Sequence, residues 1–141
     1  MKRSIAIPPP TRIAGLASSR HYLYSPAGIS EQEAQRFIEG DPSRATGYSS
    51  LQNLLNTVKT KASTMIFVDV TAAREEMTKF HLEVIQNTPH GVVTANKNPV
   101  ASSDYETFRI LTANPKRYGY RCSVMAGAGA IPFLRDSIDL N

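Results

Sequence analysis

The sequence predicts an α/β fold in which parallel strands alternate with flanking helices. Three short runs rich in apolar and β-branched residues carry this prediction, and helical patterns separate them. The runs are residues 65–70, 92–95 and 118–125. Each run ends in small or polar residues, and in open parallel sheets ligands bind at the carboxyl ends of the strands. The sequence therefore predicts the fold class and also the edge of the sheet at which a site lies.

The amino-terminal part predicts a leader followed by one short strand. Three consecutive prolines, residues 8–10, favour polyproline II, so residues 1–11 are expected to be a disordered leader. Residues 13–17 form a candidate strand, and a polar loop is expected to begin at Ser18.

Two helices are expected next. Ser30 and Glu33 have the spacing of a capping box, and the helix that they begin is expected to end at Gly40. Ser49 or Ser50 caps the second helix. Its apolar residues recur at the spacing of one helix face: Leu51, Leu54, Leu55 and Val58.

The remaining elements alternate between strands and helices. The apolar run 65–70 is typical of a strand that is covered on both faces. A helix is expected from Ala73 to about Asn87, with Met77, Phe80 and Val84 turned inward; His81 either joins them or lies on the surface. After the strand 92–95, Ser102 or Ser103 is expected to cap a helix that carries Tyr105, Phe108 and Leu111. A last strand, 118–125, and a last helix, 131–140, complete the pattern.

Composition excludes several classes of function. The chain has 141 residues, a net charge of +4 and a pI near 9.4, which would suit a phosphate-bearing ligand. Its basic residues are scattered, however, and no nucleic-acid-binding motif is present, so no nucleic-acid partner is expected. No segment approaches the ~20 apolar residues of a membrane span. We expect a soluble, cytoplasmic protein without a membrane partner.

Cysteine and histidine offer no metal site. Cys122 is the only cysteine, so an intramolecular disulfide is impossible, and we expect it to be a small apolar residue in a strand. The three histidines lack the spacing of metal ligands and are expected on the surface or in the packing: His21, His81 and His90.

The segment 91–100 is the most informative in the chain. Its apolar run ends in Thr94-Ala95-Asn96-Lys97, and Pro99 blocks further strand. This places Asn96 and Lys97 at the carboxyl end of a strand. A lysine there can pair with a phosphate or a substrate carboxylate, or polarise a carbonyl, although a solvated loop residue is the alternative.

Three other places are candidates for ligand contact. Thr71 and Ala72 end the first parallel strand with a hydroxyl and a minimal side chain, over which a cofactor can pass; a helix N-cap by Thr71 is the alternative. Gly127 lies in a small-residue strand end that allows close backbone approach. Arg20 follows the first strand, where an arginine can meet the 2′-phosphate of NADP, or it is a free surface residue.

Taken together, these segments resemble homoserine dehydrogenase. The matching blocks stand in that family's order: RIAGLASSR (12–20), YSPAGIS (24–30), FVDVTAA (67–73), HGVVTANKNPVASSDY (90–105) and YRCSVMAGAGAIPFLRD (120–136). The resemblance implies a Rossmann-like sheet with flanking helices and NAD(P)-dependent interconversion of aspartate 4-semialdehyde and homoserine. That reaction belongs to threonine, methionine and isoleucine synthesis. Arg20 inclines the expected cofactor toward NADP.

The resemblance also implies roles for the candidate residues. Thr71, Ala72 and Gly127 would line the cofactor site, and Arg20 would lie near the adenosine ribose. Asn96 and Lys97 would stand where the nicotinamide meets the substrate, with Lys97 orienting both.

The sequence departs from the family at both ends. A family member begins with a strand and a G-x-G-x-x-G loop, but here the Pro-rich leader occupies that place. The expected organisation is a leader at 1–11, a partial NAD(P)-binding domain at 12–126 and the start of a substrate and dimerisation domain at 127–141. The fold is therefore expected to be incomplete, without the first βα unit and without the substrate domain that holds the main acid–base group. A homo-oligomer is expected only of a complete protein.

A cation site is implied as well, with one ligand altered. The family's backbone ligands correspond to Val124, Ala126 and Ala128, but Arg121 stands where the family usually has an acidic residue. A guanidinium cannot coordinate a cation. A second hypothesis remains open, in which the chain is a non-catalytic remnant that binds a nucleotide weakly or pairs with another polypeptide.

Overall fold

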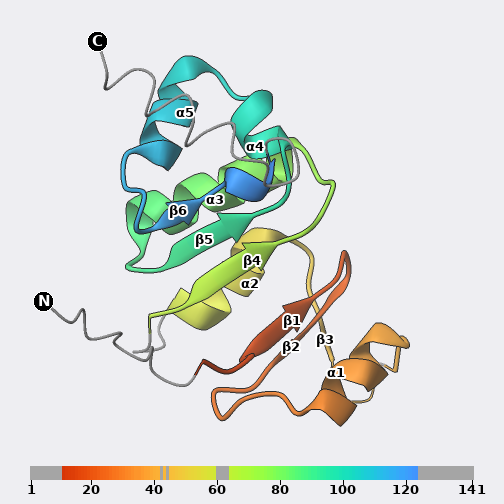
Figure 1. The fold of residues 1–141 in the computed structure, drawn as a ribbon. Coiled ribbons are helices and arrows are strands. Elements are labelled where there is room, and N and C mark those ends of the chain that lie inside the picture. The colour runs from red at the N-terminus through yellow and green to blue at the C-terminus, as the bar shows by residue number, and fades with distance from the viewer. Residues whose placement is uncertain (1–10, 42, 44, 60–63, 124–141) are drawn as a thin grey trace, which may run out of the picture. The chain divides into compact units, whose positions relative to one another are not determined.

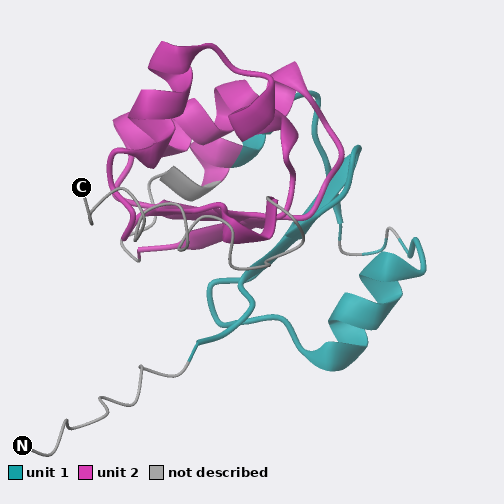
Figure 2. Cartoon of the chain, turned by 45° about the horizontal axis from the view of Figure 1, so that its top comes forward, with its two compact units in different colours: residues 1–54 teal, residues 55–141 magenta. Residues whose placement is uncertain are grey.

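The computed structural model describes residues 11–41, 43, 45–59 and 64–123. The chain forms two compact units, Met1–Leu54 and Leu55–Asn141 (Figure 2). Each unit has its own sheet. The predicted domain boundary between residues 126 and 127 lies outside the described residues.

The first unit contains a small antiparallel sheet. Strand β2 (His21–Tyr24) lies between β1 (Gly15–Ala17) and β3 (Thr46–Gly47). The strand expected near residues 13–17 is present as β1, but residues 21–24 form a second strand where a loop was expected. Ser18 explains the difference, because its backbone N–H donates to the His21 carbonyl at 2.9 Å and closes a tight turn between the strands.

Helix α1 (Glu31–Ile38) begins and ends as predicted. Ser30 Oγ accepts the backbone N–H of Glu33 at 3.3 Å, and the Glu33 carboxylate accepts the backbone N–H of Ser30 at 3.0 Å. This reciprocal pair is the predicted capping box. Gly40 follows the helix with φ of +85°, a left-handed conformation that glycine adopts without strain.

Helix α2 (Leu51–Lys59) begins after Ser50, one of the two predicted caps. Ser50 Oγ accepts the backbone N–H of Asn53 at 3.4 Å. Leu55, one of the four residues in the predicted apolar face, is fully buried.

The second unit has the predicted α/β fold. Three parallel strands lie in chain order (Figure 1): β4 (Ile66–Asp69), β5 (Gly91–Thr94) and β6 (Tyr118–Gly119). Helix α3 (Glu75–Asn87) joins β4 to β5. Helices α4 (Asn98–Ala101) and α5 (Tyr105–Thr112) join β5 to β6. A Rossmann-like, partial sheet was predicted, and the fold class is confirmed.

The core of this unit lies between the sheet and its helices. The predicted inward face of α3 is confirmed, since Met77, Phe80, His81 and Val84 are all buried. Val92 of β5, Leu111 of α5 and Tyr118 of β6 are buried as well. Phe67 of β4 meets Phe80 edge to face, with ring centroids 5.3 Å apart. Such an aromatic pair stabilises the folded protein beyond the contribution of the apolar area that it buries.

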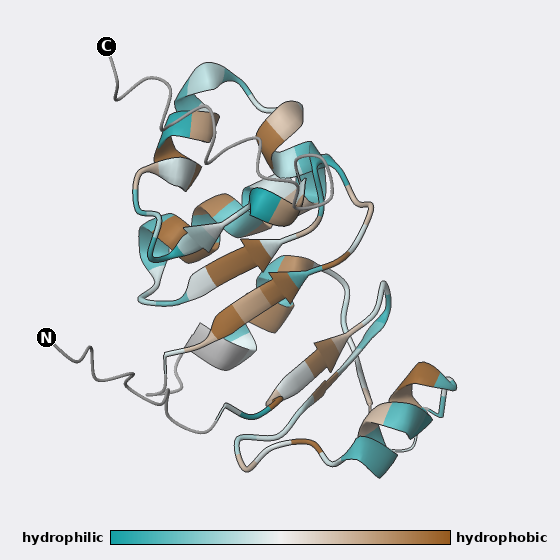
Figure 3. Ribbon diagram, in the orientation of Figure 1, coloured by the Kyte–Doolittle hydropathy of each residue, from teal (hydrophilic) through white to brown (hydrophobic). Residues whose placement is uncertain are grey.

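The described helices of the second unit do not cover the opposite face of its sheet. Ile66 and Val68 of β4 are 66% and 68% exposed, and Val93 of β5 is 42% exposed. Figure 3 shows this apolar character along β4 and β5. The prediction that residues 65–70 are covered on both faces is therefore wrong. Because strand order follows chain order, crossovers of one hand place α3, α4 and α5 on the same side.

Two helix starts differ from the prediction. Pro99 lies in the first turn of α4, where its missing N–H costs nothing, so the segment that ends β5 turns at once into helix. Asp104, rather than Ser102 or Ser103, caps α5, because its carboxylate accepts the backbone N–H of Thr107 at 2.7 Å.

The last strand is shorter than predicted. Strand β6 ends at Gly119, and Arg121–Ser123 form a 3₁₀ turn, so the expected strand 118–125 is wrong over residues 120–123; residues 124 and 125 lie outside the described part of the chain. Both the backbone N–H and the hydroxyl of Ser123 donate to the Tyr120 carbonyl, at 3.0 and 2.6 Å. Cys122 lies in this turn and is exposed, which corrects its expected place in a strand. Among the described helices, none has the length and apolar composition needed to cross a bilayer.

Candidate functional site

The candidate site lies at the carboxyl ends of β4 and β5. Asp69 and Thr94 are the last residues of these strands and are paired in register. Two loops follow them, residues 70–74 before α3 and residues 95–97 before α4. Because the strands are parallel and adjacent, both loops meet at one edge of the sheet. This is the edge at which parallel sheets bind ligands.

The Asp69 carboxylate is the centre of this edge. Its Oδ1 accepts the backbone N–H and the hydroxyl of Thr71, at 2.9 and 2.8 Å. Its Oδ2 accepts the Thr94 hydroxyl at 3.2 Å and lies 3.2 Å from Nε2 of His81. Asp69 is only 6% exposed. A buried carboxylate with this many donors is fully hydrogen-bonded, as a buried charge must be.

These contacts keep Asp69 ionised. Burial by itself raises the pKa of Asp69, but the hydrogen bonds from His81 and Thr71 outweigh it and lower the pKa to about 2. The negative charge has an effect on its neighbours. Burial, and then the charge of Asp69, raise the pKa of the Tyr118 phenol well above its ordinary value.

His81 joins Asp69 to the third strand. The His81 ring is fully buried, and its Nδ1 lies 2.9 Å from the Tyr118 hydroxyl on β6. Asp69 offers acceptors only, so Nε2 of His81 carries the proton that faces it. In neutral His81, Nδ1 then accepts the Tyr118 hydroxyl. The three side chains form a buried chain that runs from the site across the sheet.

Asn96 links the two loops. Its Nδ2 donates to the Ala73 carbonyl at 2.7 Å, and its Oδ1 accepts the backbone N–H of Asn98 at 3.0 Å. Asn98 in turn donates to the carbonyls of Ala72 and Ala73, at 3.2 and 3.3 Å. Asn96 is 3% exposed, so its amide forms hydrogen bonds within the protein rather than with a ligand. Its role in the structure is to connect the loop after β4 with the loop after β5.

Lys97 is a cationic side chain at this edge, as is the exposed Arg74 at the end of the other loop. It is exposed and stands at the N-cap of α4, where its carbonyl accepts the backbone N–H groups of Val100 and Ala101 at 3.2 and 2.8 Å. The backbone is thus fixed, and the ammonium has no hydrogen bond or ion pair to another described residue. A positioned backbone with a free charged end suits recognition of an anion.

Thr71 and Ala72 lie in the loop after β4, at the same end of the sheet as Lys97, and both are exposed. Thr71 does not cap a helix: α3 begins at Glu75, after Arg74, which provides no side-chain cap. That alternative is therefore wrong.

The other predicted site residues lie elsewhere. Arg20 is exposed in the turn between β1 and β2 and belongs to the first unit. Four predicted residues lie outside the described part of the chain: Val124, Ala126, Gly127 and Ala128. Among the described residues, no group of His, Cys, Asp and Glu side chains is arranged to hold a metal ion.

Sequence reasoning missed Asp69, His81 and Tyr118. Asp69 sits inside an apolar run, and an aspartate there needs hydrogen-bond donors when the strand is buried. The aspartate within the apolar run could therefore have indicated a buried, hydrogen-bonded carboxylate. Nothing in the sequence indicated that His81 and Tyr118, 37 residues apart, would be the groups that complete the chain.

The exposed residues of this edge leave room for a ligand. Thr71 and Ala72 are small, and Lys97 supplies a positive charge, so the edge suits an anionic group. No described segment supplies a glycine-rich pyrophosphate loop.

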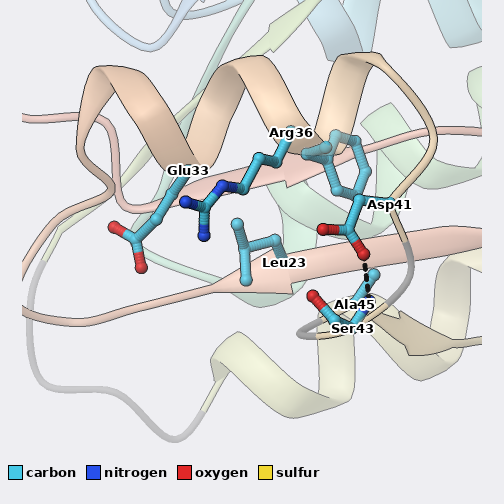
Figure 4. A pocket seen from close by; sticks show the side chains of 7 residues that line it. Leu23, Glu33, Arg36, Asp41, Ser43 and Ala45 are labelled. Atoms are coloured by element: carbon cyan, nitrogen blue, oxygen red, sulfur yellow. Dashed lines mark hydrogen bonds between the residues drawn. The ribbon is translucent and has the colours of Figure 1, made fainter.

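A small hollow in the first unit is the other depression that we considered. It lies between α1 and β2, and Leu23 and Phe37 line its apolar part (Figure 4). The charged rim is satisfied locally, since Asp41 accepts the backbone N–H of Ser43 at 2.9 Å. It has none of the convergent buried polar groups of the sheet edge.

Comparison with known proteins bears on the fold alone. No known protein family and no curated protein matches the sequence. The fold is similar to that of a crystal structure of a protein of unknown function from Candida auris, with a TM-score of 0.72 and 20% identity. The match covers 97% of this chain and 38% of that protein, so this chain spans about two fifths of its length.

Proposed function

We propose that this chain is part of an NAD(P)-dependent oxidoreductase of the homoserine dehydrogenase type. One observation of the structure supports the proposal most. The resemblance assigns Thr71 and Ala72 to the lining of the cofactor site and Lys97 to the nicotinamide end, and all three lie after the carboxyl ends of two adjacent parallel strands. The choice of substrate, aspartate 4-semialdehyde or homoserine, rests on the resemblance of the sequence blocks to homoserine dehydrogenase.

In this proposal each group has a limited task. The cofactor supplies or accepts the hydride at the carbonyl carbon of the semialdehyde. Lys97 orients the substrate and the nicotinamide through its charge, and Asn96 holds the loop that carries Lys97. The main acid–base group lies outside the chain. The protein works in the cytoplasm on small molecules, without a nucleic acid or a membrane, and forms a homo-oligomer when complete.

The proposal is tested by mapping NADPH on the protein with amide chemical shifts. We expect the largest shifts in residues 71–73 and 95–97. Lys97→Ala should weaken binding, whereas Lys116→Ala should not. Lys116 is a fair control because it is exposed and precedes β6, at the opposite edge of the sheet. Shifts centred on Lys116, or equal effects of the two substitutions, would contradict the proposal.

Turnover by the chain alone is a separate matter. Orientation of the reacting groups supplies roughly 7–11 kcal/mol in a well-built site. The groups that orient homoserine lie outside the chain in this proposal, so the purified protein should not oxidise homoserine. Sustained NADPH formation above a Lys97→Ala control would contradict that part.

A second candidate is a non-catalytic module that pairs with another polypeptide. The uncovered apolar face at Ile66, Val68 and Val93 favours it, because contiguous exposed apolar surface marks interaction sites. In that case NADPH should leave residues 71–73 and 95–97 unperturbed.

A further inference from the structure

We infer that Asp69 is a positioning residue, whose carboxylate sets the conformation of both loops of the candidate site through Thr71 and Thr94. The inference goes beyond the proposed function, because the conformation of the loops can be measured without any cofactor. Only its consequence for cofactor binding rests on the proposed function.

The first branch runs from Asp69 into the loop after β4. Oδ1 holds Thr71 by its N–H and its hydroxyl, at 2.9 and 2.8 Å. The Thr71 hydroxyl oxygen then accepts the backbone N–H of Ala73 at 3.3 Å. Since Ala72 lies between these two residues, its exposed methyl group is held in one place. Oδ1 of Asp69 therefore holds the Thr71 end of this loop, while Asn96 and Asn98 hold its carbonyls at Ala72 and Ala73.

The second branch runs into the loop after β5. The Thr94 hydroxyl lies 3.2 Å from both Oδ2 of Asp69 and the Asn96 carbonyl, so these two oxygens share its one proton. The hydroxyl oxygen accepts the backbone N–H of Asn96 at 3.0 Å, and Asn96 Oδ1 then accepts the N–H of Asn98 at 3.0 Å. Lys97 lies between Asn96 and Asn98, so its backbone is fixed on both sides. Oδ2 of Asp69 therefore orients the hydroxyl group on which the position of the Lys97 backbone depends.

His81 lies against Oδ2 of Asp69. Its ring is fully buried, and Nε2 lies 3.2 Å from Oδ2 of Asp69 while Nδ1 meets the Tyr118 hydroxyl at 2.9 Å. Nε2 approaches the carboxylate without the geometry of a hydrogen bond, so Tyr118 is the hydrogen-bond partner that positions the ring. The directions of the two carboxylate oxygens are therefore set by Thr71 and Thr94.

The experiment is native-state amide hydrogen exchange of Asp69→Asn. The asparagine keeps the size of the side chain, but its Nδ2 cannot accept the Thr94 hydroxyl, and its Oδ1 offers Thr71 an uncharged acceptor in place of the carboxylate. We expect exchange of the Thr71 and Asn96 amides to become roughly three- to tenfold faster, because a charged acceptor is replaced by a weaker neutral one. Val84, in the middle of α3, reports on global stability and should change less. Equal acceleration at Val84, or unchanged loops, would overturn the inference.

A second pair of variants keeps the test decisive if Asp69→Asn does not fold. Thr94→Val removes only the second branch, so the Asn96 amide should exchange faster and the Thr71 amide should not. Thr88→Val is the matched control: its buried hydroxyl also donates and accepts, to the Val84 carbonyl at 2.7 Å and from the His90 N–H at 3.1 Å, at the opposite edge. If Thr88→Val changed the Asn96 amide as much, Asp69 would have no special role.

NADPH binding separates the inference from the proposed function. If Asp69→Asn frees the loops and weakens NADPH binding as Lys97→Ala does, both stand. If the loops are freed and wild-type protein binds no NADPH, the inference stands and the proposed function fails. If NADPH binding persists with unaltered loop exchange in Asp69→Asn, the inference is overturned and the proposed function stands.

Discussion

Asp69 Oδ1 accepts two hydrogen bonds from one residue, the backbone N–H of Thr71 at 2.9 Å and its hydroxyl at 2.8 Å. This double contact turns the chain at the end of β4 and leaves Oδ2 for Thr94 and His81. Because the hydrogen-bond donors favour the ionised form, the carboxylate of Asp69 stabilises the folded protein and also orients the loops of the candidate site.

We expect the folded protein to lose stability in acid because Asp69 becomes protonated. Its pKa falls from 3.8 to about 2 on folding, so its contribution is complete above the unfolded value and is lost as pH falls through about 2. That difference corresponds to about 2 kcal/mol. Urea unfolding between pH 6 and pH 2.5 should show a smaller decrease for Asp69→Asn than for wild type. Glu76→Gln, at an exposed residue of α3, should match wild type.

His90 should affect stability in a different pH range. Burial, and then the charge of Arg117, lower the pKa of His90, so the folded protein keeps the ring neutral. Unfolding releases this restraint, and stability therefore falls as pH decreases through the unfolded value near 6.5 and levels off below the folded value. His90→Asn retains an acceptor for the Met65 N–H, which His90 Nδ1 accepts at 3.1 Å. Its unfolding free energy should vary less than that of wild type between pH 7.5 and 5; an equal slope would contradict the assignment.

Arg117 closes the amino edge of the same sheet. Its guanidinium donates to four backbone carbonyls around the end of α3, those of Val84, Ile85, Thr88 and His90. A lysine cannot reproduce this planar set of donors. Arg117→Lys should lower the free energy of unfolding by about 2 kcal/mol or more, because it leaves carbonyls unpaired. Arg109→Lys, in an exposed pair with Glu106, should have no measurable effect.

The sequence was sufficient to predict the fold class, because the spacing of apolar and capping residues follows the geometry of helices and strands. The inward side chains of α3 and the capping box of α1 follow from spacing alone, and both are present. The apolar run 65–70 was misleading, since composition cannot show whether a second layer exists to cover the strand. Only the structure shows Ile66 and Val68 exposed.

The position of the candidate site could be predicted from the sequence, but the hydrogen bonds that position its loops could not. Thr71, Ala72 and Lys97 were found because strand ends can be recognised in the sequence. The hydrogen-bonded role of Asn96 depends on Ala73, 23 residues away, and the role of His81 depends on Tyr118, 37 residues away. Such contacts arise from the packing of α3 against the sheet and leave no local pattern.

Substitutions of Val92 and Val93 test whether helices cover only one face of the parallel sheet. The two neighbours point to opposite faces, with Val92 1% exposed and Val93 42% exposed. Valine to threonine keeps the shape and adds one hydroxyl, which costs about 1–3 kcal/mol when it is buried without a partner. Val92→Thr should therefore lower the free energy of unfolding by that amount, while Val93→Thr should change it by less than about 0.5 kcal/mol. Equal losses would mean that both faces are covered.

The last prediction concerns cofactor selectivity at Arg20. The resemblance to homoserine dehydrogenase implies that Arg20 lies at the adenosine end, where it would meet the 2′-phosphate that distinguishes NADPH from NADH. Arg20→Ala should then raise the dissociation constant of NADPH by roughly 10- to 100-fold, which is the ~1.5–3 kcal/mol of a hydrogen bond to a charged group. The constant for NADH should not change, because NADH has a hydroxyl where NADPH has the phosphate. Arg12→Ala, at another exposed arginine of the first unit, serves as the control and should affect neither cofactor. The two constants are measured by amide chemical-shift titration, which detects weak binding. If Arg20→Ala weakened both cofactors equally, or neither, Arg20 would be an ordinary surface residue and the inclination toward NADP would have no support.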